Sequence, residues 1–140
     1  MRVDLDLVRV VEQSGAEFSR RQTLAYIAVA PAAAAACEPC DGGALISFGH
    51  GRYVNRALGV GFGGLPAEEA VAAIDRFYSA RGMPPSLELS PWADEALLPA
   101  LATAGFVAER FRNVYAHDLR SLPPAHWASA SVDCLRRRPS

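Results

Sequence analysis

The chain has 140 residues, of which 51% are hydrophobic and 21% are charged, and its formal net charge is −1. These totals predict one globular domain and exclude a disordered chain, which would need fewer apolar residues or a larger net charge. A near-neutral charge argues against nucleic acid as a partner, because nucleic-acid-binding domains are strongly basic. No apolar run reaches the roughly 20 residues of a membrane-spanning helix, so no membrane partner is expected.

The three cysteines, Cys37, Cys40 and Cys134, are an odd number, which argues against a disulfide framework. Arg20 and Arg21 precede an alanine-rich run that ends at Cys37, which resembles a twin-arginine export signal. Export signals, however, begin with a short basic region that is poor in acidic residues. Here the preceding residues include four acids, at positions 4, 6, 12 and 17. We expect the chain to be cytoplasmic, with export as the alternative.

Apolar residues recur at helical spacing near the start of the chain and predict a helix over residues 4–29. The predicted core stripe consists of Leu5, Val8, Val11, Gly15, Phe18, Gln22, Ala25 and Val29. Gly15 weakens the middle, so the pattern also permits two helices, and Pro31 ends the helical region. Residues 31–43 are small and punctuated by Gly and Pro, which predicts a connector.

Two apolar runs then predict strands over residues 43–49 and 56–62, joined through a turn at His50 and Gly51. In the second strand Gly59 and Gly61 leave one face without side chains, which is typical of a strand approached closely by another backbone or a ligand. A helix is expected from Pro66 to about Arg81, capped by Gly82.

The remaining elements are a strand over residues 86–90, a helix from Asp94 to Ala104, and strands over 106–112 and 114–119, or one bulged strand. Alternating strands and helices predict an α/β (α+β) fold, with a mixed central sheet, crossover helices and helices on both faces. The expected organisation is a single domain over residues 1–120, followed by a loose tail over residues 121–140.

Four segments occur in an order that resembles the amino-terminal half of bacterial two-domain GNAT (GCN5-related N-acetyltransferase) proteins. They are residues 54–63, 77–82, 87–94 and 104–115, within a resemblance that covers residues 4–120. The resemblance implies a GNAT-like fold, in which a divergent first domain precedes a second domain that carries the cofactor site. It therefore implies a second GNAT domain, or a homodimer, as the partner.

In active GNAT domains a central strand runs into a loop of the type Arg/Gln-x-x-Gly-x-Gly/Ala, which cradles the pyrophosphate of acetyl-CoA. The corresponding segment here is Gly63–Glu69, and the cofactor contacts, if acetyl-CoA binds at all, are Gly61, Phe62, Gly63 and Gly64. Three features of this segment oppose phosphate binding. Pro66 lacks an amide donor, no Arg or Lys is present, and the next helical turn carries two acids, Glu68 and Glu69. We expect no cofactor for this chain alone, and acetyl-CoA only if the family activity is retained.

Many GNAT enzymes also carry a tyrosine, four residues before a Gly-Phe pair, that protonates the leaving thiolate. The matching position holds Leu101, which cannot donate a proton, and Asp94 stands where the family often has asparagine. No catalytic residue is assigned to this chain. The expected function is a supporting, non-catalytic half of an acetyltransferase. The alternatives are a non-enzymatic binding or dimerisation module and a truncated remnant.

Cys37 and Cys40 have the spacing of half a zinc knuckle, but a structural zinc site needs four ligands. The other candidates are scattered along the chain: Cys134, His50, His117 and His126. We therefore expect no metal, and interpret His50 as a turn residue and His117 and His126 as outside any catalytic triad. Tyr78 and Trp92 are interpreted as core or interface aromatics, and the arginines at 136–138 as a solvated terminus.

Overall fold

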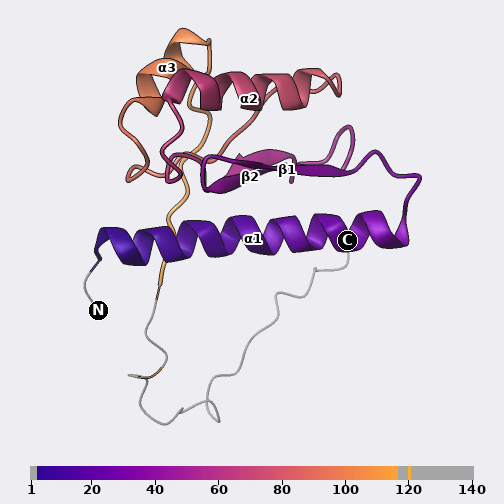
Figure 1. Cartoon of the computed structure of the whole chain (residues 1–140), viewed down its shortest axis with the longest axis horizontal. Helices are drawn as coiled ribbons and strands as arrows, with labels where there is room; N and C mark the ends of the chain where they lie inside the picture. The colour runs from indigo at the N-terminus through magenta and orange to yellow at the C-terminus, as the bar shows by residue number, and fades with distance from the viewer. Residues whose placement is uncertain (1–2, 117–119, 121–140) are drawn as a thin grey trace, which may run out of the picture.

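The computed structural model describes residues 3–116 and residue 120. Its elements are helix α1 (Leu5–Val29), strands β1 (Ala36–Cys40), β2 (Gly43–Ser47) and β3 (Arg56–Leu58), and helices α2 (Ala67–Ser79) and α3 (Leu97–Thr103). The sheet lies between α1 on one face and α2 with α3 on the other (Figure 1). At this level the α+β class, with helices on both faces of a sheet, is confirmed.

The three strands pair in the order β1-β2-β3, and both pairs are antiparallel. β1 and β2 form a hairpin whose turn residues, Asp41 and Gly42, have φ angles of 46° and 84°. An Asp-Gly pair favours this left-handed turn. The predicted connector over residues 31–43 is therefore wrong, because its second half is the first strand of the sheet. Pro39 is tolerated there because β1 is an edge strand.

One parallel pairing extends the sheet beyond β3, and the chain reaches it through α2. The Ala57 N–H donates to the Ser86 carbonyl at 2.8 Å, and the Glu88 N–H donates to the Ala57 carbonyl at 2.9 Å. These bonds form a single bridge between Ala57 and Leu87. Helix α2 makes the expected crossover between β3 and this bridge. The strand expected over residues 86–90 is reduced to the bridge, so β1, β2 and β3 pair only in antiparallel fashion.

The predicted strand over residues 56–62 ends early because Gly59 and Gly61 take positive φ angles of 66° and 98°. A Cβ on Gly59 would lie 3.1 Å from the Glu12 carbonyl oxygen, and one on Gly61 would lie 2.5 Å from the Leu97 side chain. The close approach expected at these glycines is therefore made by α1 and by α3, which belong to the chain itself.

Helix α2 packs its apolar face on the sheet and forms the larger core. Its buried residues are Ala67, Ala70, Val71, Ile74, Phe77 and Tyr78. The Tyr78 hydroxyl donates to the Ile46 carbonyl at 3.0 Å and accepts from the Ile46 N–H at 3.3 Å. Both backbone polar groups of one β2 residue are thus bonded to α2, which fixes the helix to the sheet.

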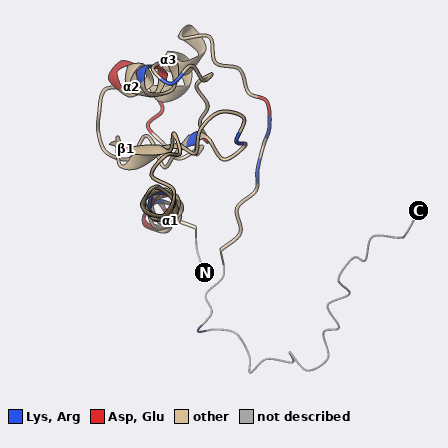
Figure 2. Ribbon diagram, turned by 90° about the vertical axis from the view of Figure 1, so that its right-hand side faces the viewer, with Lys and Arg blue, Asp and Glu red and all other residues tan. Residues whose placement is uncertain are grey.

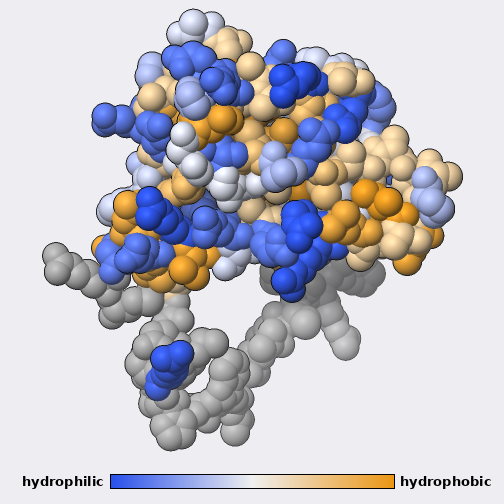
Figure 3. Space-filling model, viewed as in Figure 1, coloured by the Kyte–Doolittle hydropathy of each residue, from blue (hydrophilic) through white to orange (hydrophobic). Residues whose placement is uncertain are grey.

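Helix α1 runs without interruption through Gly15, so the two-helix alternative is wrong. Only Ala16 and Thr23 are buried, while Phe18 and Val29 of the predicted stripe are exposed. The stripe is therefore not the face that α1 buries against the sheet. Along the α1 layer, apolar side chains gather at both ends and hydrophilic ones lie between them (Figure 3). None of the described helices combines the length and apolarity needed to cross a bilayer.

After α3 the chain continues as an extended trace past the sheet (Figure 2). Residues 107–116 are exposed and form no strand, so the strand predicted over 106–112 is wrong. The strand predicted over 114–119 is absent up to residue 116, and residues 117–119 lie outside the described residues. The predicted tail over residues 121–140 also lies outside them. Helix α3 begins at Leu97, one turn later than predicted, because Asp94 caps a preceding turn by accepting from the Ala96 N–H at 2.9 Å.

Candidate functional site

The glycine-rich loop between β3 and α2 packs directly against the turn of the β1–β2 hairpin. A Cβ on Gly63 would lie 2.6 Å from the Gly42 nitrogen, and a Cβ on Gly42 would lie 2.9 Å from the Gly63 nitrogen. Real Cβ atoms essentially never come so close to another backbone. Both glycines are therefore required by the contact between the two turns.

The side chain of Asp41 occupies the amides of this loop. Its Oδ1 accepts from the Gly63 N–H at 3.1 Å and from the Leu65 N–H at 2.8 Å. Its backbone carbonyl accepts from the Phe62 N–H at 3.2 Å. Free loop amides next to a helix amino terminus are what an anion-binding loop offers to phosphate. Here three loop amides are already bonded to one aspartate of the chain itself.

Of the four predicted cofactor contacts, three are thus engaged within the chain. Phe62 and Gly63 donate to Asp41, and the Gly61 carbonyl accepts from the Asp94 N–H at 3.0 Å. Gly64 is exposed, has a φ of 84° and faces open space. The loop is brought together as a unit, but its partners are the hairpin turn and the segment before α3.

The first turn of α2 carries the two expected acids. Glu68 and Glu69 are both exposed there, and Pro66 precedes them as an N-cap that makes no side-chain capping bond. Acidic side chains at this end of a helix interact favourably with its dipole. The same two charges would repel a phosphate approaching the helix end.

Leu101 is buried in the core between α3 and α2. The position that the resemblance matches to a general acid therefore lies in packed apolar surroundings. Asp94 is exposed, and its carboxylate is engaged with the Ala96 N–H. Neither residue supplies a proton donor to the loop.

Cys37 and Cys40 lie three residues apart on β1, so their side chains point to opposite faces of the sheet. Cys37 packs with the cluster under α1, and Cys40 is buried in the core under α2. Burial raises the pKa of both thiols, which lowers their reactivity. The two cannot share a metal or a disulfide, although both are free.

No three His, Cys, Asp or Glu side chains gather as metal ligands within residues 3–116. His50 lies in the turn between β2 and β3, and Trp92 is half-exposed, whereas Tyr78 is part of the core. Outside the described residues lie Cys134, His117, His126 and the arginines at 136–138.

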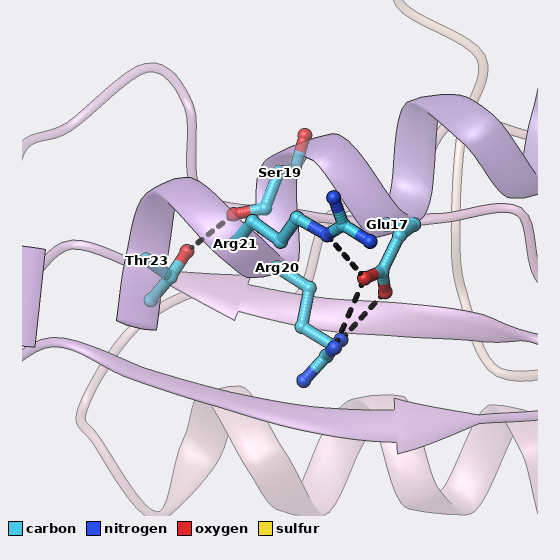
Figure 4. Close-up of polar contacts among 5 residues, drawn as sticks. All are labelled: Glu17, Ser19, Arg20, Arg21 and Thr23. Carbon is cyan, nitrogen blue, oxygen red and sulfur yellow. Dashed lines mark hydrogen bonds and ion pairs between the residues drawn. The ribbon is translucent and has the colours of Figure 1, made fainter. Parts of the chain in front are cut away.

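The arginine pair that resembles an export signal lies in the middle of α1. Arg20 Nε donates to Glu17 Oε2 at 2.7 Å, and Arg21 Nε donates to Glu17 Oε1 at 2.7 Å (Figure 4). These hydrogen bonds, first from Arg20 and then from Arg21, lower the pKa of Glu17 to about 2. The three charged groups form one exposed cluster on the helix surface.

A second charged cluster was not expected from the sequence. Arg56 Nε lies 2.6 Å from Glu88 Oε1, and Arg112 contacts the other oxygen of the same carboxylate. The three residues come from β3, from the segment after α2 and from the segment after α3. Because they are far apart in the chain, no local spacing could have revealed them.

Comparison with known proteins gives no match to a protein-family model, a curated protein or a solved structure. The features of the structure that bear on function are therefore the geometry of the Asp41 loop and the order of the elements.

Proposed function

We propose that this chain is a GNAT-like domain that does not hold acetyl-CoA itself. It supports a cofactor-binding partner in the cytoplasm, either a second GNAT domain or a second copy of the chain. The single observation that carries the proposal is the Asp41 carboxylate on the amides of Gly63 and Leu65. The succession of a helix, antiparallel strands, a crossover helix and one parallel pairing supports the GNAT-like affiliation.

A pyrophosphate could take these two amides only if the Asp41 carboxylate left them. Hydrogen bonds to a charged group contribute about 1.5–3 kcal/mol each, so displacement has a substantial cost. No Arg or Lys lies between Arg56 and Arg76 to offset the charge of the incoming phosphates. Glu68 and Glu69 add repulsion at the same helix end. The loop thus favours its own carboxylate over an external anion.

The decisive experiment is isothermal titration of the whole chain with acetyl-CoA up to millimolar concentration. The proposal predicts no saturable heat, and saturable binding in the micromolar range would overturn it. Inorganic pyrophosphate serves as the matched control, because it carries the same charged group without the pantetheine and adenine. Binding of pyrophosphate alone would show that the loop amides remain available.

A second candidate function, a non-enzymatic binding or dimerisation module, is favoured by one feature. The unpaired segment after α3 exposes large apolar side chains, with Val107 80%, Phe111 97% and Tyr115 88% exposed. Such side chains are covered when an extended segment pairs with another chain. Light scattering and affinity capture from lysate test this module. A strict monomer that recovers no partner counts against it.

A further inference from the structure

An open hollow of about 830 Å³ lies between α1, the β3 side of the sheet and the extended segment after α3, which contributes Arg112 and Val114. Its α1 wall includes five members of the stripe predicted to be core: Val11, Gly15, Phe18, Gln22 and Ala25. Small-molecule sites typically enclose roughly 300–1,000 Å³ and are mostly apolar with a few placed polar groups. The stripe that fails to pack on the sheet therefore borders a space of ligand size.

One part of the hollow is aromatic. The rings of Tyr26 and Phe48 line it with their centroids 5.4 Å apart and their planes tilted by 43°. Ile46 and Leu58 add aliphatic surface from the sheet. Aromatic and aliphatic walls of this kind suit a flat, ring-sized apolar body.

Another part of the lining is charged and rich in hydrogen-bond donors. The guanidinium groups of Arg56 and Arg112 share the single carboxylate of Glu88. Arg56 Nε is buried and, despite its short distance to Glu88, makes no aligned hydrogen bond. Arg56 Nη1 also donates to the Tyr53 carbonyl at 3.3 Å. Each guanidinium offers five donors, so the Glu88 carboxylate and this carbonyl leave several of them unused. Glu12 also lines the hollow, but it forms no ion pair with either arginine.

We propose that this hollow binds a small organic acid, with a carboxylate or sulfonate on a ring-sized apolar body. The acid group takes the spare donors of Arg56 and Arg112, and the apolar body lies against the α1 stripe and the Tyr26–Phe48 pair. This goes beyond the proposed function, because the hollow shares no lining residue with the loop over 61–69.

Two fluorescent dyes with the same ring system provide the test on the whole chain. Anilinonaphthalene sulfonate carries the acid group, and phenylnaphthylamine lacks it. The proposal predicts one saturable sulfonate site per chain, weakened about tenfold by Arg112→Gln through loss of charge-assisted bonds. Phenylnaphthylamine binds more weakly and is insensitive to that substitution. Arg110→Gln, an exposed arginine outside the hollow, leaves both dyes unaffected.

A second variant tests the apolar wall independently of charge. Ala25→Trp fills the hollow from α1 and is expected to abolish binding of both dyes, whereas Ala28→Trp, exposed on α1 outside the hollow, leaves binding intact. Circular dichroism verifies that each variant is folded. Sulfonate binding that survives both Arg112→Gln and Ala25→Trp, or equal affinity for the two dyes, overturns the proposal. Dye binding that is seen only after a dimer of the chain has dissociated also overturns the proposal. In that case a second copy of the chain fills the hollow in the dimer.

Discussion

The two faces of the sheet differ in how completely they are covered. Helix α2 has 13 residues and buries six of them, whereas α1 has 25 residues and buries two. The core under α2 is therefore continuous, while the cluster under α1 contains only three buried residues, Ala16, Ala44 and Ile46. Because hydrophobic stabilisation follows the apolar area buried, the α2 face should hold the fold together. The α1 face keeps exposed apolar side chains and borders the hollow that also contains Arg56 and Arg112.

The largest test of this difference is a matched pair of leucine truncations. Leu97 is fully buried where α3 meets α2, and Leu24 on α1 is 44% exposed. Leu97→Ala should lower the free energy of unfolding by about 2–5 kcal/mol, because it leaves a cavity in a packed core. Leu24→Ala should change it by less than about 0.5 kcal/mol. Urea denaturation measures both, and equal losses would contradict the contrast between the faces.

Tyr78→Phe sharpens the same contrast by removing one hydroxyl from the α2 face. The Ile46 N–H and carbonyl would lose their partner in a buried place, which should cost about 1–3 kcal/mol. Tyr53→Phe is the matched control, since Tyr53 is almost fully exposed, and should leave stability unchanged. Similar losses in the two variants would exclude a special role for the Tyr78 hydroxyl.

Ionisation of Tyr78 should make the stability of the fold depend on pH in the alkaline range. Burial raises the pKa of Tyr78, so the folded protein keeps the neutral phenol after the unfolded chain has begun to ionise. Stability should therefore fall as pH rises above about 10, the ordinary pKa of tyrosine. Denaturation at a series of alkaline pH values should show a shallower fall in Tyr78→Phe. An identical slope in both proteins would contradict the assignment.

Asp41→Asn tests the contact between the hairpin turn and the loop. Asparagine tolerates the same backbone conformation but lacks the charge, so the bonds to Gly63 and Leu65 should weaken. We expect a loss of about 1 kcal/mol and faster amide hydrogen exchange at those two residues. Glu95→Gln, exposed in the segment before α3, should alter neither quantity. Unchanged exchange in Asp41→Asn would show that the carboxylate does not hold the loop.

The smallest effect is expected on α1. Glu17 has its pKa lowered to about 2, so its contribution is present above the ordinary carboxyl pKa, about 4.3, and is lost as pH falls toward 2. Exposed ion pairs contribute little and are screened by salt. The stability difference between the native chain and Glu17→Gln should thus be small at neutral pH and vanish in acid or in high salt. A difference that persists in high salt would contradict an exposed cluster.

The sequence predicted elements well where a pattern is local. Apolar residues at helical spacing predict α2 and the helix over residues 4–29. A glycine after the last helical residue predicts the end of α3 at Gly105. β1 was missed because Pro39 and small residues suggest a connector, although Asp41-Gly42 is a hairpin signal. The buried face of α1 was misassigned because small residues, Ala16 and Thr23, face the sheet in place of the larger apolar ones.

The candidate site was predictable only in part. The opposing charges of Glu68 and Glu69 and the missing amide of Pro66 are local and can be seen in the sequence. The carboxylate that takes the loop amides comes from a residue 22 positions earlier than Gly63, across a hairpin that was itself not predicted. Contacts of this kind depend on how two turns meet, and spacing along one chain carries no signal for them.

The most direct test of the central claim follows the backbone amides of Gly63 and Leu65 by two-dimensional nitrogen–proton NMR while acetyl-CoA is added to the whole chain. If Asp41 keeps these amides, their resonances should stay in place up to millimolar acetyl-CoA. A saturable shift of both resonances, with the neighbouring Glu68 and Glu69 amides following, would show that the loop accepts the cofactor and would contradict the account.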